Sequence, residues 1–314
     1  MQLFRGFQHQ HFQDNPIAAT IGNFDGVHLG HQALIQALKL QAAKHLLPTA
    51  VILFEPQPAE YFQREQAPAR LYSLREKLRQ LAQLGIDYAI CLKFDKKMAL
   101  TPADDFAKRI LFNTLNIKYL LTGEDFRFGY QRQGNYETLQ RQAKLCHAEV
   151  DCFNNFTVEK NRVSSTNIRQ ALERGDFESA ERLLGRTYAI SGRVMHGDKR
   201  GRKWGIPTAN IKLSHNRMPI QGVFDVWVMR SNGQAHAGVA NIGNRPTVDG
   251  TTFFLEVHLH HFEQSLYGER LRVVFLHKRR DEIKFANVDD LIRQIHQDIQ
   301  ESEAYFAKPN NFDR

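Results

Sequence analysis

The sequence predicts an α/β domain with a parallel sheet, followed by an antiparallel β-barrel with a C-terminal helix. Two observations support this fold class. Short apolar runs alternate with amphipathic helical patterns in the first half, as they do in βαβ units. After about residue 186, strand-like segments follow one another between Gly, Asn and Pro turns, which is typical of a closed antiparallel sheet. We therefore expect one domain over residues 1–185 and a second over residues 186–314.

The apolar runs of the first half are short enough to be buried strands. They cover residues 17–22, 50–54, 88–92 and 118–123. Between them, the segments QALIQALKLQAAKHL, SLREKLRQLAQLG and ADDFAKRILFNTL have apolar residues at three- and four-residue spacing, as amphipathic helices do. Strands and helices in this order predict a parallel sheet covered on both faces, whose ligands bind at the carboxyl ends of the strands.

The second half contains strand patterns flanked by helical ones. The expected strands are ISGRVM, TANIKL, VFDVWVM, AHAGVANIG, TFFLEVHLH and RLRVVFL. The segment LERGDFESAERLLGRTY, at the expected boundary, is predicted to form one or two helices. A final helix over residues 288–306 repeats Leu291, Ile295 and Ile299 on one face, which suits packing against the barrel.

Composition excludes several classes of protein. No run approaches the roughly 18 apolar residues of a membrane helix, and the N-terminus lacks the apolar region of a secretory signal. These features predict a cytoplasmic protein. The three cysteines, Cys91, Cys146 and Cys152, form no CxxC pair, which argues against a disulfide framework or a thiolate zinc site. The net charge of +8 favours a polyanionic partner, either nucleic acid, an acidic lipid surface or nucleotide phosphates.

The segment IGNFDGVHLGHQALI connects the first buried strand to a helix. Gly22, Gly26 and Gly30 let the backbone approach a ligand closely, and the free N–H groups of a helix start bind phosphate. His28 and His31 can both point at one phosphate there, where they would stabilise the charge that builds up during displacement. A zinc pair or two incidental surface histidines are the alternatives, but no further zinc ligand is nearby in the sequence.

A second phosphate-binding pattern follows the first domain's last strand. Ser164, Ser165 and Thr166 stand at the start of a helical segment, where hydroxyl groups cap a helix and can also contact phosphate. Arg169 lies one turn further along, where its guanidinium can bind a triphosphate. A plain helix cap is the simpler interpretation of this segment when it is taken alone.

The second half has a basic, Gly-rich loop that can cover phosphates. Its glycines and basic residues are Gly192, Gly197, Gly201, Gly205, His196, Lys199, Arg200, Arg202 and Lys203. The loop ends in the string PTAN, in which Thr208 and Asn210 point to the same side of an extended chain. Two neutral oxygen ligands side by side suit a Mg²⁺ ion shared with ATP phosphates. A basic turn of this kind can equally be an ordinary solvated loop.

The strand over residues 252–260 supplies a carboxylate. Leu255, Val257 and Leu259 fall on one face, and the opposite face consists of Phe254, Glu256, His258 and His260. Glu256 is either part of a structural ion pair or a general base, and the strand alone does not decide between them. The two histidines also permit a zinc site, which we consider the weaker interpretation.

Several of these strings resemble one known family. His28-Leu29-Gly30-His31 is similar to the HxGH signature of nucleotidyltransferases, and residues 22–31 resemble the version found in bacterial bifunctional riboflavin kinase/FAD synthetases. The strings FEPQP, GEDFRFG and VSSTNIR, at residues 54–58, 123–129 and 163–169, also resemble that family. In the second half PTAN, GVANIGNRPTV and LYGERLRVVFLHKRRDEIKF resemble its riboflavin kinase domain. The similar strings span the chain from Gly22 to Phe285.

This resemblance implies a Rossmann-like nucleotidyltransferase domain followed by a β-barrel riboflavin kinase domain. It implies that ATP phosphorylates riboflavin to FMN in the barrel, and that a second ATP adenylylates FMN to FAD in the first domain. Mg²⁺ is the implied cofactor, and riboflavin, FMN, FAD and ATP are the implied partners. Neither nucleic acid nor a membrane is expected as a partner, and the sequence does not give the oligomeric state.

The resemblance also assigns roles to residues. The implied catalytic residues are Glu256, which deprotonates the ribityl hydroxyl of riboflavin, and His28, His31 and Arg169. The implied ATP-binding residues are Gly22, Phe24, Asp25, His28, His31, Ser164, Ser165, Thr166, Arg169, Gly197, Lys203, Gly205 and Thr208. The implied flavin contacts are Asp125, Phe128, Arg280, Asp281 and Phe285, and the implied metal ligands are Thr208 and Asn210. The FRFG aromatics fit a core as well as they fit a flavin site.

Two other functions fit parts of the sequence. A nucleotidyltransferase for another acceptor could use the barrel as a specificity module, but such a module needs neither PTAN nor Glu256. A basic barrel could bind RNA, but that function favours exposed aromatics alternating with Lys and Arg on the strands. Here the basic residues cluster in the Gly-rich loop instead.

Overall fold

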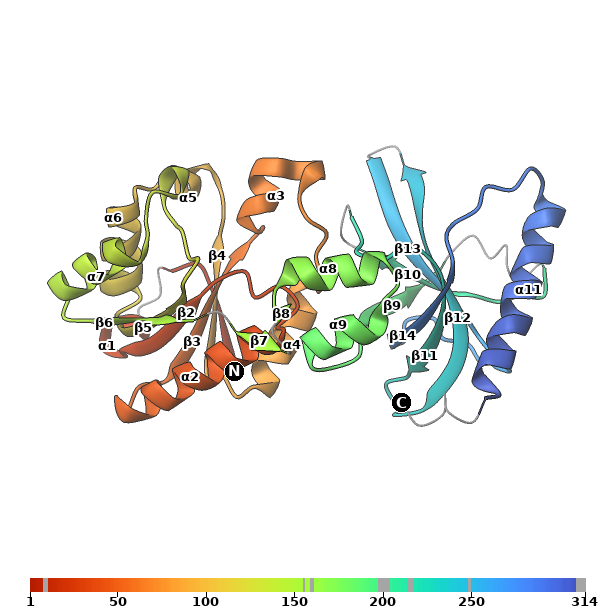
Figure 1. The fold of residues 1–314 in the computed structure, drawn as a ribbon, viewed down its shortest axis with the longest axis horizontal. Coiled ribbons are helices and arrows are strands. Elements are labelled where there is room, and N and C mark those ends of the chain that lie inside the picture. The colour runs from red at the N-terminus through yellow and green to blue at the C-terminus, as the bar shows by residue number, and fades with distance from the viewer. Residues whose placement is uncertain are drawn as a thin grey trace. The chain divides into compact units, whose positions relative to one another are not determined.

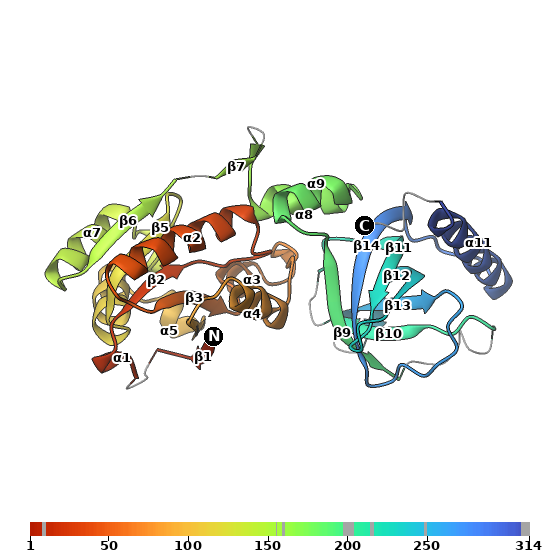
Figure 2. The same ribbon diagram turned by 90° about the horizontal axis from the view of Figure 1, so that it is seen from below.

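The computed structural model describes residues 1–7, 11–154, 156–158, 161–196, 204–213, 217–247 and 250–308. Its contacts divide the chain into two compact units. The first consists of Met1–Pro68 and Tyr72–Ser165, and the second of Ala69–Leu71 and Thr166–Arg314. Figures 1 and 2 show the elements of each unit as ribbons.

The first unit is built on a six-stranded parallel sheet with the order β1-β4-β3-β2-β5-β6. Its strands are β1 (Gln2–Arg5), β2 (Ile17–Ile21), β3 (Thr49–Glu55), β4 (Tyr88–Lys93), β5 (Ile117–Gly123) and β6 (Glu149–Phe153). The predicted parallel sheet is confirmed, and the predicted strands are the inner ones β2 to β5. The edge strands β1 and β6 were missed because their residues are partly exposed and lack a continuous apolar run.

Helices cover both faces of this sheet (Figure 1). Alternate residues of β2 belong to two separate cores: Ile17 and Ala19 pack on one side of the sheet and Ala18 on the other. The first side is closed by the π-helix η2 (Phe106–Thr114) and by α7 (Tyr136–Leu145), and the second by α2 (Leu29–Lys44) and α4 (Leu74–Gln83). The remaining short elements are α1 (His11–Asp14), α3 (Pro58–Gln63), η1 (Arg64–Gln66), α5 (Lys96–Ala99), α6 (Ala103–Asp105), η3 (Tyr130–Arg132), β7 (Thr157–Val158) and β8 (Asn161–Arg162).

The second unit is a closed antiparallel barrel with the order β10-β13-β12-β11-β14-β9. Its strands are β9 (Ala189–Met195), β10 (Ala209–Leu213), β11 (Gly222–Met229), β12 (Ala235–Thr247), β13 (Gly250–Leu259) and β14 (Arg270–Arg280). Closure leaves no strand edge, and apolar side chains such as Phe224 and Phe275 are fully buried inside. The predicted barrel and C-terminal helix are therefore confirmed.

The helices α8 (Ser165–Glu173) and α9 (Phe177–Leu184) occupy the segment around the expected domain boundary. The contacts assign the chain from Thr166 onward to the second unit. Phe177 of α9 packs against the rings of Phe224 and Phe275, at 5.8 and 6.2 Å between centroids. The boundary between residues 185 and 186 stays a prediction.

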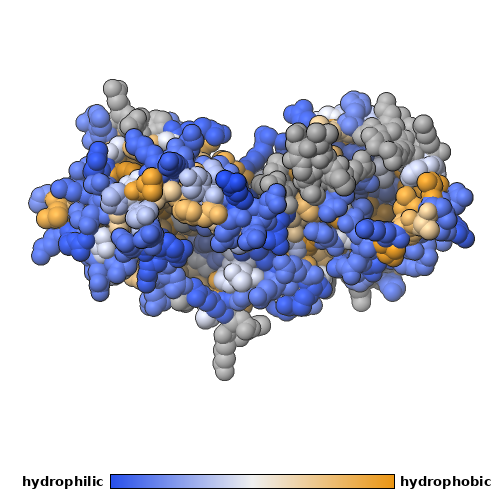
Figure 3. Space-filling view, turned by 90° about the horizontal axis from the view of Figure 1, so that it is seen from above, coloured by the Kyte–Doolittle hydropathy of each residue, from blue (hydrophilic) through white to orange (hydrophobic). Residues whose placement is uncertain are grey.

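The C-terminal helix α11 (Val288–Phe306) packs on β12 and β11 (Figure 2). The expected stripe of Leu291, Ile295 and Ile299 is only half-buried. The fully buried residues of this helix are Asp298, Ser302 and Phe306. The two polar ones have partners on the barrel, since Asp298 binds Arg280 and Ser302 binds His260, and such partners remove the cost of burying polar groups. On the face of the protein shown in Figure 3, hydrophilic residues predominate and apolar ones form small separate patches.

His260 makes the stability of the second unit dependent on pH. Its ring is buried, and its Nε2 shares a hydrogen bond of 2.9 Å with Ser302 Oγ. Burial, followed by the charges of His258 and His261, lowers the pKa of His260 from 6.5 to about 4. Between these two values the unfolded chain binds a proton that the folded one does not, so stability falls as the pH falls through this window.

We expect this histidine to cost the second unit about 2 kcal/mol of unfolding free energy between pH 7.5 and pH 5. His260→Gln keeps a hydrogen-bonding side chain without a titrating group. Between pH 7.5 and pH 5 the variant should therefore lose about 2 kcal/mol less unfolding free energy than the wild type. Chemical unfolding followed by tryptophan emission measures this, because both tryptophans of the chain, Trp204 and Trp227, lie in the second unit. Equal pH dependence in the two proteins would contradict the prediction.

Candidate active sites

The histidine motif lies at the carboxyl end of the central strand β2, where α2 begins. His28 is the N-cap of α2, and its Nδ1 accepts a hydrogen bond of 3.3 Å from the backbone N–H of His31. The two imidazole rings stack with 3.6 Å between centroids, and the ring of Phe24 lies 4.8 Å from that of His31. Because His28 Nδ1 is an acceptor, a neutral His28 has its proton on Nε2, which is then a donor.

The loop before these histidines has an unusual backbone. Phe24 and Val27 have φ angles of +47° and +40°, a region that residues other than glycine rarely adopt, and Gly26 has +84°. Such backbone persists only where surrounding contacts enforce it, and it clusters at functional sites. A Cβ at Gly30 would lie 3.3 Å from the His28 ring, a tight contact that would press on the histidine.

Three contacts hold this loop in place. Ser165 Oγ donates to the Asp25 carbonyl at 2.8 Å, and the buried Asp25 carboxylate accepts the backbone N–H of Tyr72 at 3.3 Å. The almost fully buried Lys77 of α4 donates to the Asn23 carbonyl at 2.5 Å. The sequence predicted Asp25 and Ser165 as site residues, but nothing in the pattern of α4 distinguishes Lys77 from a surface lysine.

Thr166 and Arg169 belong to the second unit. Arg169 Nε donates to the carbonyl of Ala69, a residue of the same unit, at 2.5 Å. Ser164 lies in the first unit beside Ser165. The contribution of Arg169 and Thr166 to a triphosphate site stays a prediction.

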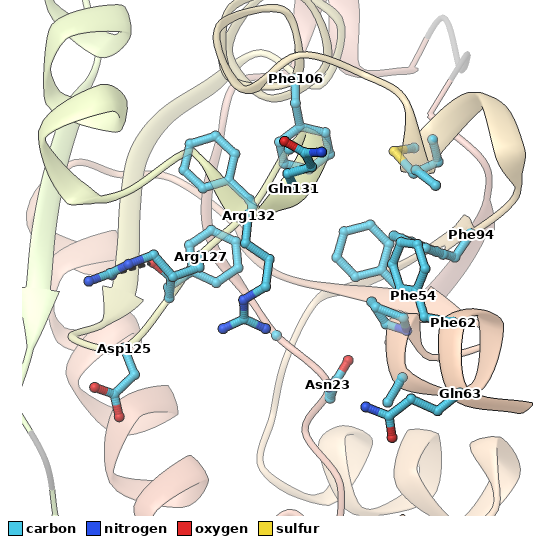
Figure 4. A pocket seen from close by; sticks show the side chains of 18 residues that line it. Asn23, Phe54, Phe62, Gln63, Phe94, Phe106, Asp125, Arg127, Gln131 and Arg132 are labelled. Atoms are coloured by element: carbon cyan, nitrogen blue, oxygen red, sulfur yellow. Dashed lines mark hydrogen bonds between the residues drawn. The ribbon is translucent and has the colours of Figure 1, made fainter. Parts of the chain in front are cut away.

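A cavity of about 530 Å³ opens beside the histidine loop (Figure 4), within the usual size range of small-molecule sites. One wall is aromatic and is formed by Phe54, Phe62, Phe94, Phe106, Phe126 and Phe128. The polar residues of the lining are Asn23, Gln63, Asp125, Arg127, Gln131 and Arg132. Gly22 and Asn23 line this cavity and also begin the histidine loop, so the two features are continuous. Sequence reasoning found Gly22, Asp125 and Phe128 of this lining.

Two glycines fix the position of the Phe128 ring. Gly129 has φ +73°, and a Cβ there would lie 2.5 Å from the Cα of Ala103, while a Cβ at Gly134 would lie 2.7 Å from the Phe128 ring. Phe128 and Gly134 exchange both backbone hydrogen bonds, at 3.2 and 2.9 Å. Asp125, at the opening of the cavity, forms an ion pair with Arg162 of β8.

In the second unit, Glu256 of β13 lies between two asparagines. Its register partners are Asn210 on β10 and Asn241 on β12, and directly opposed residues of antiparallel strands share a face. Leu255 and Val257 are buried in the barrel, whereas Glu256 is half-buried on the other face, as the alternation predicted.

The PTAN segment leads into β10. Asn210 Nδ2 lies 3.5 Å from Thr208 Oγ1, so these two side chains are adjacent, as expected from the sequence. His258 Nδ1 lies 2.9 Å from the Pro207 carbonyl and anchors the segment. Gly205 has φ +74°, while Gly197 and Lys203 lie outside the described residues. Among the residues that the structure describes, no three His, Cys, Asp or Glu side chains are placed to hold a metal ion.

The segment after β14 contains the other expected flavin contacts. Arg280 forms a bidentate ion pair with Asp298 of α11, with Nε and Nη2 at 2.9 and 2.6 Å. Asp281 pairs with Lys278 at 2.6 Å, and Phe285 is half-buried. Sequence reasoning did not single out Glu282 of this segment or Asn241 of β12.

Within the described part of the chain, no helix is long and apolar enough to cross a membrane.

Comparison with known proteins identifies relatives of both units. Family models described as FAD synthetase and riboflavin kinase match residues 10–167 and 184–306. A Haemophilus influenzae protein named bifunctional riboflavin kinase/FMN adenylyltransferase is 47% identical over 98% of this chain and 99% of its own. The Escherichia coli K12 protein of that name is 44% identical over 98% of each chain. A crystal structure titled macrolide-efflux protein from Streptococcus pneumoniae shares the fold, with a TM-score of 0.78, 31% identity, and coverage of 96% of this chain and 99% of that one.

Proposed function

The chain belongs to the bifunctional riboflavin kinase/FMN adenylyltransferases and makes FMN and then FAD with ATP, and from that premise we propose which residues perform each step. The kinase step belongs to the barrel and the adenylyl transfer to the first unit. We keep residues 1–185 and 186–314 as the two domains, a division supported by the two family matches. A cytoplasmic location stays a prediction of the sequence.

For adenylyl transfer, the isoalloxazine ring of FMN occupies the aromatic cavity and the reacting phosphates lie at the histidine loop. The observation that supports this placement is that Gly22 and Asn23 belong to both features. An oxygen of the FMN phosphate attacks the α-phosphorus of ATP, and pyrophosphate leaves. The attacking group is already anionic, so the enzyme needs no covalent intermediate. Its task is to place the two phosphates and stabilise the added charge.

His28 and His31 supply that stabilisation. The backbone hydrogen bond to His28 Nδ1 leaves Nε2 as the donor, and the positive end of the α2 helix dipole favours the negative charge of the phosphates. Phe24 and Asp25 shape the loop, and Ser164 and Ser165 of the same unit contact ATP by resemblance to the family. The expected ATP contacts of Thr166 and Arg169 stay predictions of that resemblance. Asp125 and Phe128 contact the flavin from the cavity wall.

For riboflavin phosphorylation, Glu256 deprotonates the terminal ribityl hydroxyl, which then attacks the γ-phosphorus of ATP as the bond to the bridging oxygen breaks and ADP leaves. The side chains of Thr208 and Asn210 are adjacent, with Asn210 Nδ2 3.5 Å from Thr208 Oγ1, and the hydroxyl and amide oxygens of such a pair are neutral ligands that would suit Mg²⁺. Bound there, Mg²⁺ would offset the charge on the phosphates. Gly205 contacts the ATP phosphates, and the same role of Gly197 and Lys203, which lie outside the described residues, stays a prediction from the resemblance. Arg280, Asp281 and Phe285 contact the flavin by resemblance to the family, and the ion pair with Asp298 holds Arg280 in position.

Product analysis tests this function. Purified protein with riboflavin, ATP and Mg²⁺ should form FMN first and FAD later, with pyrophosphate released only as FAD appears. A chelator in excess over Mg²⁺ should stop phosphorylation, because the proposed oxygen ligands cannot replace the lost charge. If FMN formed but FAD did not, the first unit would transfer a nucleotidyl group to an acceptor other than FMN. Neither product would contradict both assignments.

A further inference from the structure

Glu282 reaches the kinase site from the chain just after β14. Its carboxylate lies against Gly243 of β12, at a place where any Cβ on that glycine would collide with Glu282 Oε1. The side-chain amide of Asn241, two residues earlier on β12, lies at the same place, since its Nδ2 is 3.3 Å from the position of that Cβ, and it can donate to the carboxylate. Gly243 lies within β12 and has no positive φ angle, so its backbone conformation does not require glycine, and a Cβ there would instead displace the Glu282 carboxylate.

Asn241 connects Glu282 to the proposed base. In the barrel register Asn241 is directly opposite Glu256, and the side chains of such a pair are neighbours on one face. An asparagine amide has two N–H donors and a carbonyl oxygen, so a bond to Glu282 leaves groups available toward Glu256. Asn210, one of the proposed metal ligands, is opposite Glu256 on the other side.

The two carboxylates are close enough to affect each other. Partial burial raises the pKa of Glu282, and the negative charge of Glu256 raises it further, while the bond from Asn241 and the charge of Arg280 act the other way. The Glu282 residue is exposed to solvent, but its carboxylate lies against Gly243 of β12, next to the proposed kinase site.

We propose that Glu282 is a positioning residue of the kinase site, which holds the Asn241 amide and thereby the carboxylate of Glu256 in its reactive orientation. A half-buried glutamate has several rotamers, and holding one of them costs conformational entropy that fixed neighbours reduce. Catalytic bases are commonly oriented in this way by a third group. Gly243 is part of the arrangement because it leaves room for the carboxylate. The inference rests on the proposed role of Glu256.

Four variants test this arrangement through riboflavin phosphorylation. Glu282→Ala should lower kcat by about tenfold with KM for riboflavin within about twofold, because orientation rather than binding is lost. Glu282→Gln should stay within about twofold of the wild type, since its amide oxygen can accept the same bond. Gly243→Ala should resemble Glu282→Ala, because its methyl group displaces the carboxylate. The double variant that combines Glu282→Ala with Gly243→Ala should be no slower than either of these single variants.

Conversion of supplied FMN to FAD, measured on the same preparations, should remain unchanged. Chemical unfolding followed by tryptophan emission reports on folding of the second unit, because both tryptophans lie there. Glu263→Ala removes an exposed glutamate elsewhere on the second unit and serves as the matched control. A Glu282→Ala variant with wild-type kcat, or additive losses in the double variant, would overturn the inference. If Glu256→Ala kept full kinase activity, the assignment of Glu256 as the base would be wrong. That result differs from the one that would contradict the positioning role of Glu282.

Discussion

Glu256→Ala should lose riboflavin phosphorylation while the same protein still converts supplied FMN to FAD. Removal of a general base typically costs about 10²–10⁴-fold in rate, and nearby water replaces it poorly in a half-buried position. Chromatography of riboflavin, FMN and FAD over time measures both steps in one reaction. The adenylyl transfer should be intact because its proposed histidine loop and cavity belong to the first unit.

Two further variants separate the loss of a base from the loss of structure. Glu256→Gln keeps the size and hydrogen-bonding ability of the side chain but cannot take a proton, so it should be nearly as slow as the alanine variant. Glu263→Ala should phosphorylate riboflavin at the wild-type rate. If Glu256→Gln were fast, Glu256 would not act as a base and its role would be structural; the strand pattern left open a structural ion pair as the alternative to a base.

The sequence was most informative where structure and function depend on neighbouring residues. The inner strands of the first sheet are buried on both faces, so each appears as a continuous apolar run. The HxGH string combines a helix start and two histidines within a few residues, and the structure places them together. The edge strands were missed because exposed residues interrupt the apolar pattern, as in Glu149–Phe153.

Contacts between distant segments were not predictable in this way. Phe54, Phe62, Phe94 and Phe106 meet in one cavity, but each alone looks like an ordinary core residue. The pairing of Glu282 with Asn241 depends on the chain after β14 reaching β12, which no local pattern encodes. On α11 the apolar stripe was a poor guide because Asp298 and Ser302 find polar partners on the barrel and are buried more completely.

His28→Ala should have the opposite effect to the Glu256 variants, so that riboflavin is converted to FMN and FMN accumulates. Loss of one donor to a transition-state charge typically lowers kcat by about 10²–10³-fold. The alanine variant also loses the cap of α2, which costs about 1 kcal/mol. His28→Asn is therefore the better test, because asparagine caps a helix well but is too short to replace the Nε2 donor.

Binding of FMN distinguishes the chemical role of His28 from a structural one. The proposed isoalloxazine contacts are on the aromatic wall, and His28 is not among the residues that line the cavity. The Kd of FMN, followed by the quenching of flavin fluorescence, should therefore change by less than about threefold in His28→Asn. His296→Ala, at an exposed histidine of α11, should leave both reactions unchanged. If His28→Asn lost FMN binding together with FAD formation, the histidine would act by shaping the loop at Gly22 and Asn23 rather than by stabilising charge on the phosphates.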